Sequence, residues 1–260
     1  MARFHDIGLR HFVAQIEQAG AEVGARVRWH CDQWLAELVT DDRRALVIGR
    51  VFPLNDAAAA QIATDKVATC ALLADAGVPF VPHHLLRFGT GPDPVALTRE
   101  LVGLPAVLKP HRESSGVDVL RAVDEAEALA ALTYLEGRYR AIAVSPLLPI
   151  EDEYRLVVLD GDVLLVYRKA IAAGEWRHNL RFGARPVLDV DPTAPTPAAL
   201  AAMRALGLRF ASVDVAVVAG RPKVLEVNSG VSLEHFSQAG ERHRALAADV
   251  YRAAVRACLA

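Results

Sequence analysis

The chain has few cysteines, no long apolar run and no excess of charge of either sign, and each absence removes a class of protein. Its three cysteines, Cys31, Cys70 and Cys258, lie far apart without the spacing of a zinc site, so we interpret them as reduced structural thiols. Charge, proline or glycine interrupts every apolar run before the ~18 residues of a membrane span, and the N-terminus has no apolar signal core. The 29 Lys and Arg against 31 Asp and Glu give a net charge of −2, unlike a strongly basic nucleic-acid binder. We therefore expect a cytoplasmic protein with neither a membrane nor a nucleic-acid partner.

Hydrophobic residues make up 53% of the 260 residues, which suits a globular chain of one large or two modest domains. Such a chain buries roughly 70–75% of its unfolded surface and needs no disulfide or structural metal. Periodicity and turn residues predict helices at 12–19, 55–76, 94–102, 124–135, 198–206 and from about 241. They predict strands at 45–52, 81–87, 106–109, 117–120, 141–144, 154–159, 163–169, 212–218 and 223–228. Short strands joined by hairpins and interleaved with helices predict an α+β fold of antiparallel sheets.

The predicted hairpin at residues 212–228 carries the clearest chemical signal. Glu226 and Asn228 share one face of their strand because side chains alternate along it. A five-residue connection at 218–222 would bring Asp214 of the partner strand onto that face. Two carboxylates and an amide oxygen suit Mg²⁺, which binds a few carboxylates together with substrate phosphates. The alternative is an exposed amphipathic hairpin with incidental acids.

Two lysines extend the pattern toward phosphate binding. Lys109 ends an apolar strand and is followed by SerSerGly at 114–116, a loop whose backbone can close over phosphate oxygens. Lys66 follows an acid within an apolar helical stretch. Taken singly, each lysine is more typical of a surface residue with its stem on apolar neighbours. The sequence contains neither GxxxxGK[ST] nor GxGxxG, so a P-loop or Rossmann phosphate site is not supported.

The order of the motifs is more specific than any one of them. AspLys at 65–66 is followed by LeuProAlaValLeuLysPro with SerSerGly, GluTyrArg before an AspGly hairpin, TrpArgHisAsn, and Asp214 with GluValAsn. Over residues 55–240 this order strongly resembles the ATP-grasp superfamily of carboxylate-amine ligases. The resemblance is greatest to the ribosomal-protein glutamate ligase and lysine-biosynthesis ligase branch, and more distant to D-alanine:D-alanine ligase. It implies an ATP-grasp fold, in which two antiparallel-sheet subdomains hold ATP between them.

The resemblance also implies a role for individual residues. Two lysines, Lys66 and Lys109, would hold the phosphates, and Ser114, Ser115 and Gly116 would form a flap over them. The backbone of a hinge at Val144, Ser145 and Leu147 would contact the adenine, and Glu153, with Glu151 as a fallback, would accept hydrogen bonds from the ribose. A second loop would contact ATP through Arg177, His178 and Asn179. Catalytic positions facing the transferred phosphoryl group would be Arg155, Arg168 and Asn179. The magnesium ligands would be Asp214, Glu226 and Asn228, with Mn²⁺ as a substitute.

The sequence departs from the family pattern at the hinge and at the front. Pro146 interrupts the hinge and has no N–H, so adenine contacts must come from its neighbours. Residues 1–54 form a reduced N-terminal segment where relatives usually have a domain of about a hundred residues, so part of the usual acceptor wall is expected to be missing. The ATP-grasp domain would follow at 55–260, with an N-terminal subdomain at 55–143 and a C-terminal subdomain at 144–260.

The implied function is ATP-dependent ligation of a carboxylate to an amine through an acyl phosphate, with release of ADP and phosphate. Expected partners are small-molecule or peptide carboxylates and amines, with a homodimer left open. Phosphoryl transfer to a hydroxyl and a non-catalytic nucleotide-binding module are the alternatives. No nucleophilic side chain is needed, in agreement with structural cysteines. His83, His84 and His111 could be mistaken for metal ligands, but the sequential His83 and His84 would face opposite ways on a strand, which favours a structural or surface role. For His178, contact with nucleotide or substrate and a structural role are equally expected.

Overall fold

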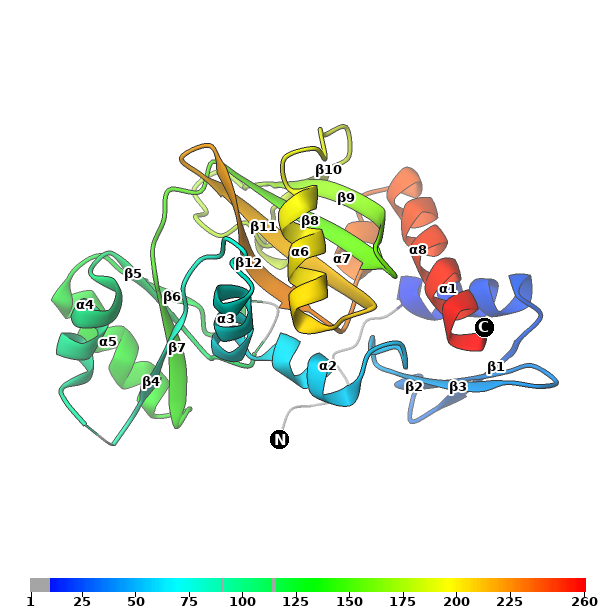
Figure 1. Cartoon of the computed structure of the whole chain (residues 1–260), viewed down its shortest axis with the longest axis horizontal. Helices are drawn as coiled ribbons and strands as arrows, with labels where there is room; N and C mark the ends of the chain where they lie inside the picture. The colour runs from blue at the N-terminus through cyan, green and yellow to red at the C-terminus, as the bar shows by residue number, and fades with distance from the viewer. Residues whose placement is uncertain (1–9, 90, 114–115) are drawn as a thin grey trace.

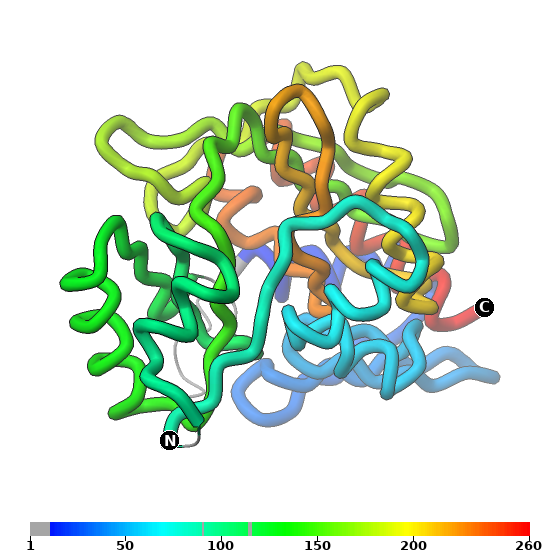
Figure 2. Tube along the Cα trace, turned by 60° about the vertical axis from the view of Figure 1, so that its left-hand side comes forward, coloured from blue at the N-terminus to red at the C-terminus, as the bar shows by residue number. Residues whose placement is uncertain are grey.

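Three antiparallel sheets and the helices packed on them form the computed structural model, which describes residues 10–89, 91–113 and 116–260 (Figure 1). The expected α+β fold of antiparallel sheets is confirmed. The two sheets of four and five strands lie side by side, with the N-terminal sheet at the far end of the five-stranded one (Figures 1 and 2). In the part of the chain that is described, no helix is long and apolar enough to cross a membrane.

The five-stranded sheet is the centre of the molecule. Its order is β10-β9-β8-β11-β12, and its strands are β8 (Asp152–Leu159), β9 (Asp162–Ala170), β10 (Arg185–Val187), β11 (Phe210–Val218) and β12 (Arg221–Asn228). One face buries alternate residues such as Leu156 and Val213 against three helices: α2 (Ala57–Thr64), α3 (Lys66–Asp75) and α6 (Thr196–Leu206). The opposite face packs Val157 and Tyr167 against helices that close the chain: α7 (Glu234–Ser237) and α8 (Glu241–Leu259). Polar residues occupy the rest of that second face.

The four-stranded sheet has its own core. Its order is β4-β7-β5-β6, and its strands are β4 (His84–Arg87), β5 (Ala106–Lys109), β6 (Leu120–Ala122) and β7 (Ala141–Pro146). Leu108 and Ile142 pack against two helices, α4 (Pro94–Val102) and α5 (Glu125–Glu136). Asp124 caps α5 through the Glu127 N–H, and two glutamates in the first turn complement the helix dipole. The strand predicted at 117–120 is found later, at β6.

The N-terminal sheet contains two strands that the sequence pattern did not reveal. Helix α1 (Arg10–Glu22) leads into β1 (Arg26–His30), β2 (Leu35–Val39) and β3 (Arg44–Ile48). Phe12 and Ile16 of α1 are buried with residues of β2, β3 and α8 in one core, as their periodicity predicted. Strand β1 escaped prediction because its sequence, ArgValArgTrpHis, has charged and exposed residues on alternate positions and only partly buried ones between them.

The helix predicted over 55–76 is wrong as a single element, because Asp65 divides it. Asp65 has extended backbone dihedrals and its side chain accepts hydrogen bonds from the N–H groups of Val67 and Ala68. It therefore ends α2 and caps α3 in one residue. The break places Lys66 at the first position of α3, where its side chain is buried.

The connection within the β11–β12 hairpin also differs from the expected one. Ala219 and Gly220 form a two-residue turn between the paired Val218 and Arg221, so the predicted five-residue connection at 218–222 is wrong. A bulge at Leu225 shifts the register by one residue and restores the pairing of Asp214 with Glu226. The expected convergence of these carboxylates is thus found, by a different route.

Candidate active site

A cavity of about 670 Å³ lies between the two larger sheets. Strands β5 and β7 line one side, and strands β8, β9, β11 and β12 line the other. Residues around β3 and the segment 176–181, which leads into η2 (Leu180–Phe182), contribute further walls. The predicted site residues that reach it are Lys66, Lys109, Gly116, Ser145, Leu147, Glu153, Arg155, Arg177, His178, Asn179, Asp214, Glu226 and Asn228. The cavity is therefore where most of the expected site comes together.

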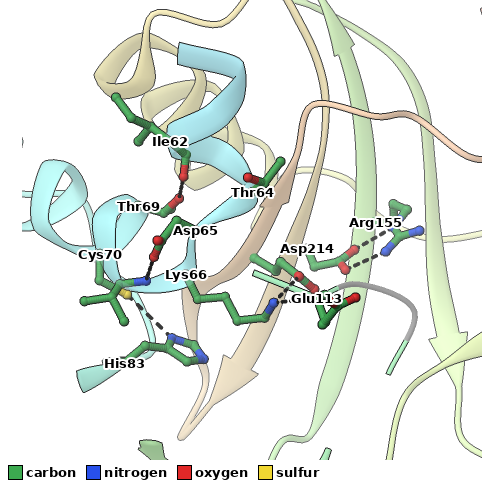
Figure 3. Close-up of polar contacts among 12 residues, drawn as sticks. Ile62, Thr64, Asp65, Lys66, Thr69, Cys70, His83, Glu113, Arg155 and Asp214 are labelled. Atoms are coloured by element: carbon green, nitrogen blue, oxygen red, sulfur yellow. Dashed lines mark hydrogen bonds and ion pairs between the residues drawn. The ribbon is translucent and has the colours of Figure 1, made fainter. Parts of the chain in front are cut away.

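Lys66 connects the cavity wall to the β11–β12 hairpin (Figure 3). Its Nζ donates to the carbonyl oxygen of Glu113 at 2.6 Å and lies 3.2 Å from Oε1 of Glu226. The side chain is only 7% exposed, so its charge is compensated by these groups alone among the described residues. The Lys66 ammonium could therefore bind an anionic oxygen of a ligand in place of the Glu113 carbonyl oxygen.

Lys109 ends β5, and its side chain lines the same cavity. Burial lowers its pKa to about 8; Glu226 opposes this shift and the nearby Lys66 ammonium adds to it. No carboxylate forms an ion pair with Lys109 in the described part of the chain, so an anionic ligand would restore its charge.

A compact cluster of buried charges fills the floor of the cavity. Arg155 donates to both oxygens of Asp214 at 2.7 Å, and the Lys169 Nζ lies 2.8 Å from Oδ2 of Asp214 and 2.5 Å from Oε1 of Glu153. Asp214, Glu153 and Lys169 are each at most 5% exposed. Burial raises the pKa of Asp214, but Arg155 and Lys169 outweigh it and hold that pKa well below its usual range. Asp214 is therefore ionised and held in one orientation.

The expected magnesium ligands are brought to one face of the hairpin. Asp214 and Glu226 are direct cross-strand partners, and Asn228 pairs with Ser212 two residues further along the same face. Burial raises the pKa of Glu226, but the nearby Lys66 and Lys109 outweigh burial and hold that pKa below its usual value. This carboxylate is therefore also ionised. No three His, Cys, Asp or Glu side chains form a metal cluster in the residues described, so only two carboxylates and an amide are available. This hard-oxygen set fits Mg²⁺ that keeps substrate phosphates among its ligands.

Arg168 is not brought to the cavity, contrary to its predicted catalytic position. Its guanidinium lies 3.0 Å from Oδ1 of Asp152, outside the cavity lining. The reason is a bulge at Leu164, where Val158 pairs with Val163 but Val157 pairs with Leu165. Without that extra residue, Arg168 would share a face with Arg155; with it, Lys169 does. Lys169 is thus a site residue that sequence reasoning missed, and only the bulge distinguishes it from its neighbour.

The predicted hinge contributes its later residues. Ser145, Pro146 and Leu147 line the cavity, whereas the Val144 side chain is fully buried in the core of the four-stranded sheet. The Leu147 N–H donates to the carbonyl oxygen of Pro105 at 3.0 Å, so this donor is already used within the protein. A planar base at the hinge would therefore form hydrogen bonds with backbone groups other than the Leu147 N–H.

Two glutamates considered for ribose binding are clearly separated. Glu153 lines the cavity, bound to Lys169. Glu151 is exposed, accepts the Gly220 N–H through both oxygens at 3.2 and 3.3 Å, and does not line the cavity. The fallback assignment to Glu151 is therefore unsupported by its position.

The loop from Trp176 to Arg181 covers one end of the cavity. Arg177 pairs with Glu175 at 2.7 Å and lies 3.7 Å above the Phe182 ring. The His178 Nδ1 lies 3.2 Å from the Lys169 carbonyl oxygen, and Asn179 caps η2 through the Arg181 N–H. All three predicted residues of this loop line the cavity while also making structural contacts.

Gly116 packs directly on this loop. A Cβ at Gly116, whose φ is +73°, would lie 2.8 Å from Cε2 of Phe182 and 3.0 Å from Nδ2 of Asn179. A larger residue would therefore push the two loops apart. The other two predicted flap residues, Ser114 and Ser115, lie outside the described residues.

The cysteines and the first histidine pair show no nucleophilic arrangement. Burial raises the pKa of Cys70 to about 11 and that of Cys258 to about 12. Cys70 contacts the buried His83, whose pKa is lowered well below its usual value chiefly by burial. Cys70, Cys258 and His83 therefore remain uncharged near neutral pH.

Comparisons with known proteins identify the family of this chain. A family model described as the RimK-like ATP-grasp domain matches residues 63–247. Probable alpha-L-glutamate ligases of Pseudoalteromonas translucida and Pseudomonas aeruginosa are 29% and 31% identical over 187 and 188 residues, which is 71% of this chain and 61% of each relative. The matched region thus spans about three fifths of the length of these curated relatives.

Solved structures show the same fold. D-alanine–D-alanine ligase of Bacillus anthracis has a TM-score of 0.61 and 20% identity, over 78% of this chain and 70% of that chain. A structure of the same enzyme complexed with ATP has a TM-score of 0.60, 21% identity and coverage of 78% and 69%. D-cycloserine synthetase DcsG has a TM-score of 0.58 and 24% identity, covering 75% and 71%. The chain therefore has the ATP-grasp fold and belongs to the RimK-like ATP-grasp family.

Proposed function

We propose that this protein is an ATP-dependent carboxylate-amine ligase that forms an amide or peptide bond and releases ADP and phosphate. The observation that carries the proposal is the cavity between the two sheets, with Lys66 and Lys109 on one wall and the oxygen ligands of the β11–β12 hairpin on the other. The names of the relatives, probable alpha-L-glutamate ligase and D-alanine–D-alanine ligase, support this reaction class. Use of ATP would place the reaction in the cytoplasm.

The nucleotide would lie with its base at Ser145–Leu147 and its phosphates toward Lys66 and Lys109. Lys66 would exchange the Glu113 carbonyl for phosphate oxygen, and Lys109 would gain the anionic partner that the described residues do not provide. Glu153 is the acid available to the ribose hydroxyls. Gly116 and the loop bearing Arg177, His178 and Asn179 would cover the phosphates and exclude water.

Asp214, Glu226 and Asn228 would hold Mg²⁺, or Mn²⁺ in its place. The ion would neutralise charge on the phosphates and act as a Lewis acid toward the transferred group. Arg155 and Lys169 already bind both Asp214 oxygens, so Asp214 would share these oxygens between metal and cations. Glu226 and Asn228 are half-buried and line the cavity, so they are the more accessible ligands.

The chemistry follows from positioning and charge. A substrate carboxylate oxygen would attack the γ-phosphorus, breaking its bond to the β–γ bridging oxygen and giving an acyl phosphate and ADP. An uncharged amine would then attack the acyl carbon, and phosphate would leave as the amine loses a proton. Arg155, the cavity cation nearest the metal ligand Asp214, would balance charge on the transferred group. No protein nucleophile is required.

Product analysis tests the proposal. The protein is incubated with MgATP and pools of amino acids, short peptides and other small acids and amines, and ADP, AMP, phosphate and product mass are followed. We expect ADP and phosphate in equal amounts with a new amide, and loss of turnover in Glu226→Gln but not in the surface control Glu136→Gln. AMP and pyrophosphate as the stoichiometric products would contradict the acyl-phosphate route.

The same experiment separates the alternatives. A phosphorylated alcohol with ADP but no free phosphate would show phosphoryl transfer to a hydroxyl. Binding of MgADP without turnover of any pool would show a non-catalytic module. Either result would replace the ligase assignment while leaving the nucleotide site in place.

A further inference from the structure

The N-terminal sheet contributes a wall to the cavity that the nucleotide and metal sites do not use. Trp34, Ile48, Arg50 and Val51 line the cavity, although all four precede the region matched by the family model. Ile48 and Val51 are 51% and 39% exposed, so they present apolar surface that no described residue covers. Figure 1 shows the blue N-terminal sheet and the green four-stranded sheet at opposite ends of the molecule, with β11 and β12 between them.

Arg50 is held next to the metal-ligand end of β12. Val51 forms an isolated antiparallel bridge with Gly230, two residues beyond Asn228. A Cβ at Gly230 would lie 3.5 Å from the Val51 side chain and 4.0 Å from the Arg50 carbonyl oxygen, so the two segments are in close contact. The bridge therefore fixes Arg50 at the end of the cavity where the terminal phosphate would lie.

None of the described residues provides a counter-ion for the Arg50 guanidinium. Its Nε is buried without a hydrogen-bond partner, and no described carboxylate pairs with the side chain. Two other arginines that line the cavity, Arg155 and Arg177, are bound to acidic residues. A half-buried guanidinium without a partner carries a desolvation cost that a planar anion would remove, and a carboxylate matches its fork of donors.

Trp34 is fixed in the wall beside it. The Gly49 N–H donates to the Trp34 carbonyl oxygen at 2.7 Å, and a Cβ at Gly49 would lie 2.7 Å from the indole ring. With φ of +58°, Gly49 accommodates both the turn and the ring. Trp34, Ile48 and Val51 line the same cavity as Arg50 and give this wall an aromatic and aliphatic character.

We propose that Arg50 binds a carboxylate of the acid substrate, whose apolar part lies against Trp34, Ile48 and Val51. This assignment rests on the proposed ligase function and specifies its substrate class: a small carboxylic or amino acid with an apolar side group. It also revises the expectation that a short N-terminal segment leaves the acceptor wall incomplete, because this segment supplies a wall of its own.

Binding without turnover tests the assignment. The probes are 4-methylpentanoate and its uncharged counterpart 4-methylpentanamide, measured by ligand-observed NMR on the full chain with saturating MgADP. We expect the wild-type protein to bind the acid more tightly than the amide. Arg50→Met should lower the affinity for the acid by about tenfold or more. Arg50→Lys should recover part of that loss because it keeps the charge without the fork. The exposed Arg43→Met is the matched control and should bind the acid normally.

Two further readouts keep the result interpretable. Thermal unfolding and MgADP affinity should be unchanged in Arg50→Met; lower MgADP affinity with normal acid binding would assign Arg50 to the nucleotide and overturn the inference. Equal binding of acid and amide to wild type would also overturn it. Ligation by Arg50→Met with an unchanged KM for the acid would refute the acid site but leave the ligase. Acid binding that depends on Arg50, without any ligation, would refute the ligase but leave the acid site.

Discussion

Two consecutive cations on β9 have different surroundings. Lys169 is buried between Glu153 and Asp214, whereas Arg168 pairs with Asp152 at the partly exposed edge of the opposite face. Replacing a buried cation between two carboxylates leaves charge without compensation, while a surface pair contributes little.

We therefore expect Lys169→Met to destabilise the fold by about 3 kcal/mol. Arg168→Met should cost less than about 1 kcal/mol. Urea unfolding of both variants measures the difference, and MgADP affinity should follow the same order. Nucleotide affinity lost in Arg168→Met but kept in Lys169→Met would restore the original assignment of Arg168.

Lys109 gives the site a pH dependence. Its pKa of about 8 in the free protein means that its ammonium is partly deprotonated above pH 8. Phosphate oxygen favours the charged form and would raise that pKa, so ADP binding at pH 8.5 should take up protons, and affinity should fall as pH rises above 8. Calorimetry in two buffers of different ionisation enthalpy measures the uptake. Lys109→Arg, which stays charged, should show none; uptake that persists in this variant would assign it to another group.

Among the secondary-structure elements, the break between α2 and α3 at Asp65 lies directly before the site residue Lys66. Asp65 caps α3 and precedes Lys66, the proposed phosphate lysine (Figure 3). Its side chain also lies 2.9 Å from Nδ1 of His111. We expect Asp65→Ala to lose about 1 kcal/mol of stability and to weaken MgADP binding, because the Lys66 end of α3 would fray. Asp65→Asn keeps a capping oxygen and should retain most of both. Thermal unfolding and nucleotide titration check this; normal affinity in Asp65→Ala would show that Lys66 does not depend on the cap.

Much of the element order could be predicted from the sequence, while register could not. Apolar periodicity correctly indicated α4, α5, α8 and most strands of the two larger sheets. The two bulges, at Leu164 and Leu225, have no local sequence signal because they depend on how paired strands twist and pack. One bulge preserved the expected carboxylate pair and the other exchanged Arg168 for Lys169. The role of each metal and nucleotide residue remains a prediction.

On the scale of the whole molecule, three sheets contribute to one cavity. The four-stranded sheet supplies Lys109 and the proposed hinge, and the five-stranded sheet supplies the charge cluster and the proposed metal ligands. The N-terminal sheet and the residues that follow it supply the wall with Arg50. The N-terminal contribution was not predictable, because β1 and β2 lack a strong alternation of apolar residues and Arg50 carries no motif. The proposed boundary between residues 54 and 55 also remains a prediction. Core packing nevertheless joins α1, β2 and β3 to α8 and the central sheet.

We propose that this cavity holds a nucleotide with a divalent cation on the β11–β12 hairpin. Crystals grown with Mn²⁺ and a non-hydrolysable ATP analogue test it most directly, since Mn²⁺ is located by its anomalous scattering. We expect an anomalous peak bounded by Glu226, Asn228 and Asp214, with the phosphates reaching Lys66 and Lys109 and the base at the hinge. A peak away from this hairpin, or a nucleotide bound outside the cavity, would contradict it.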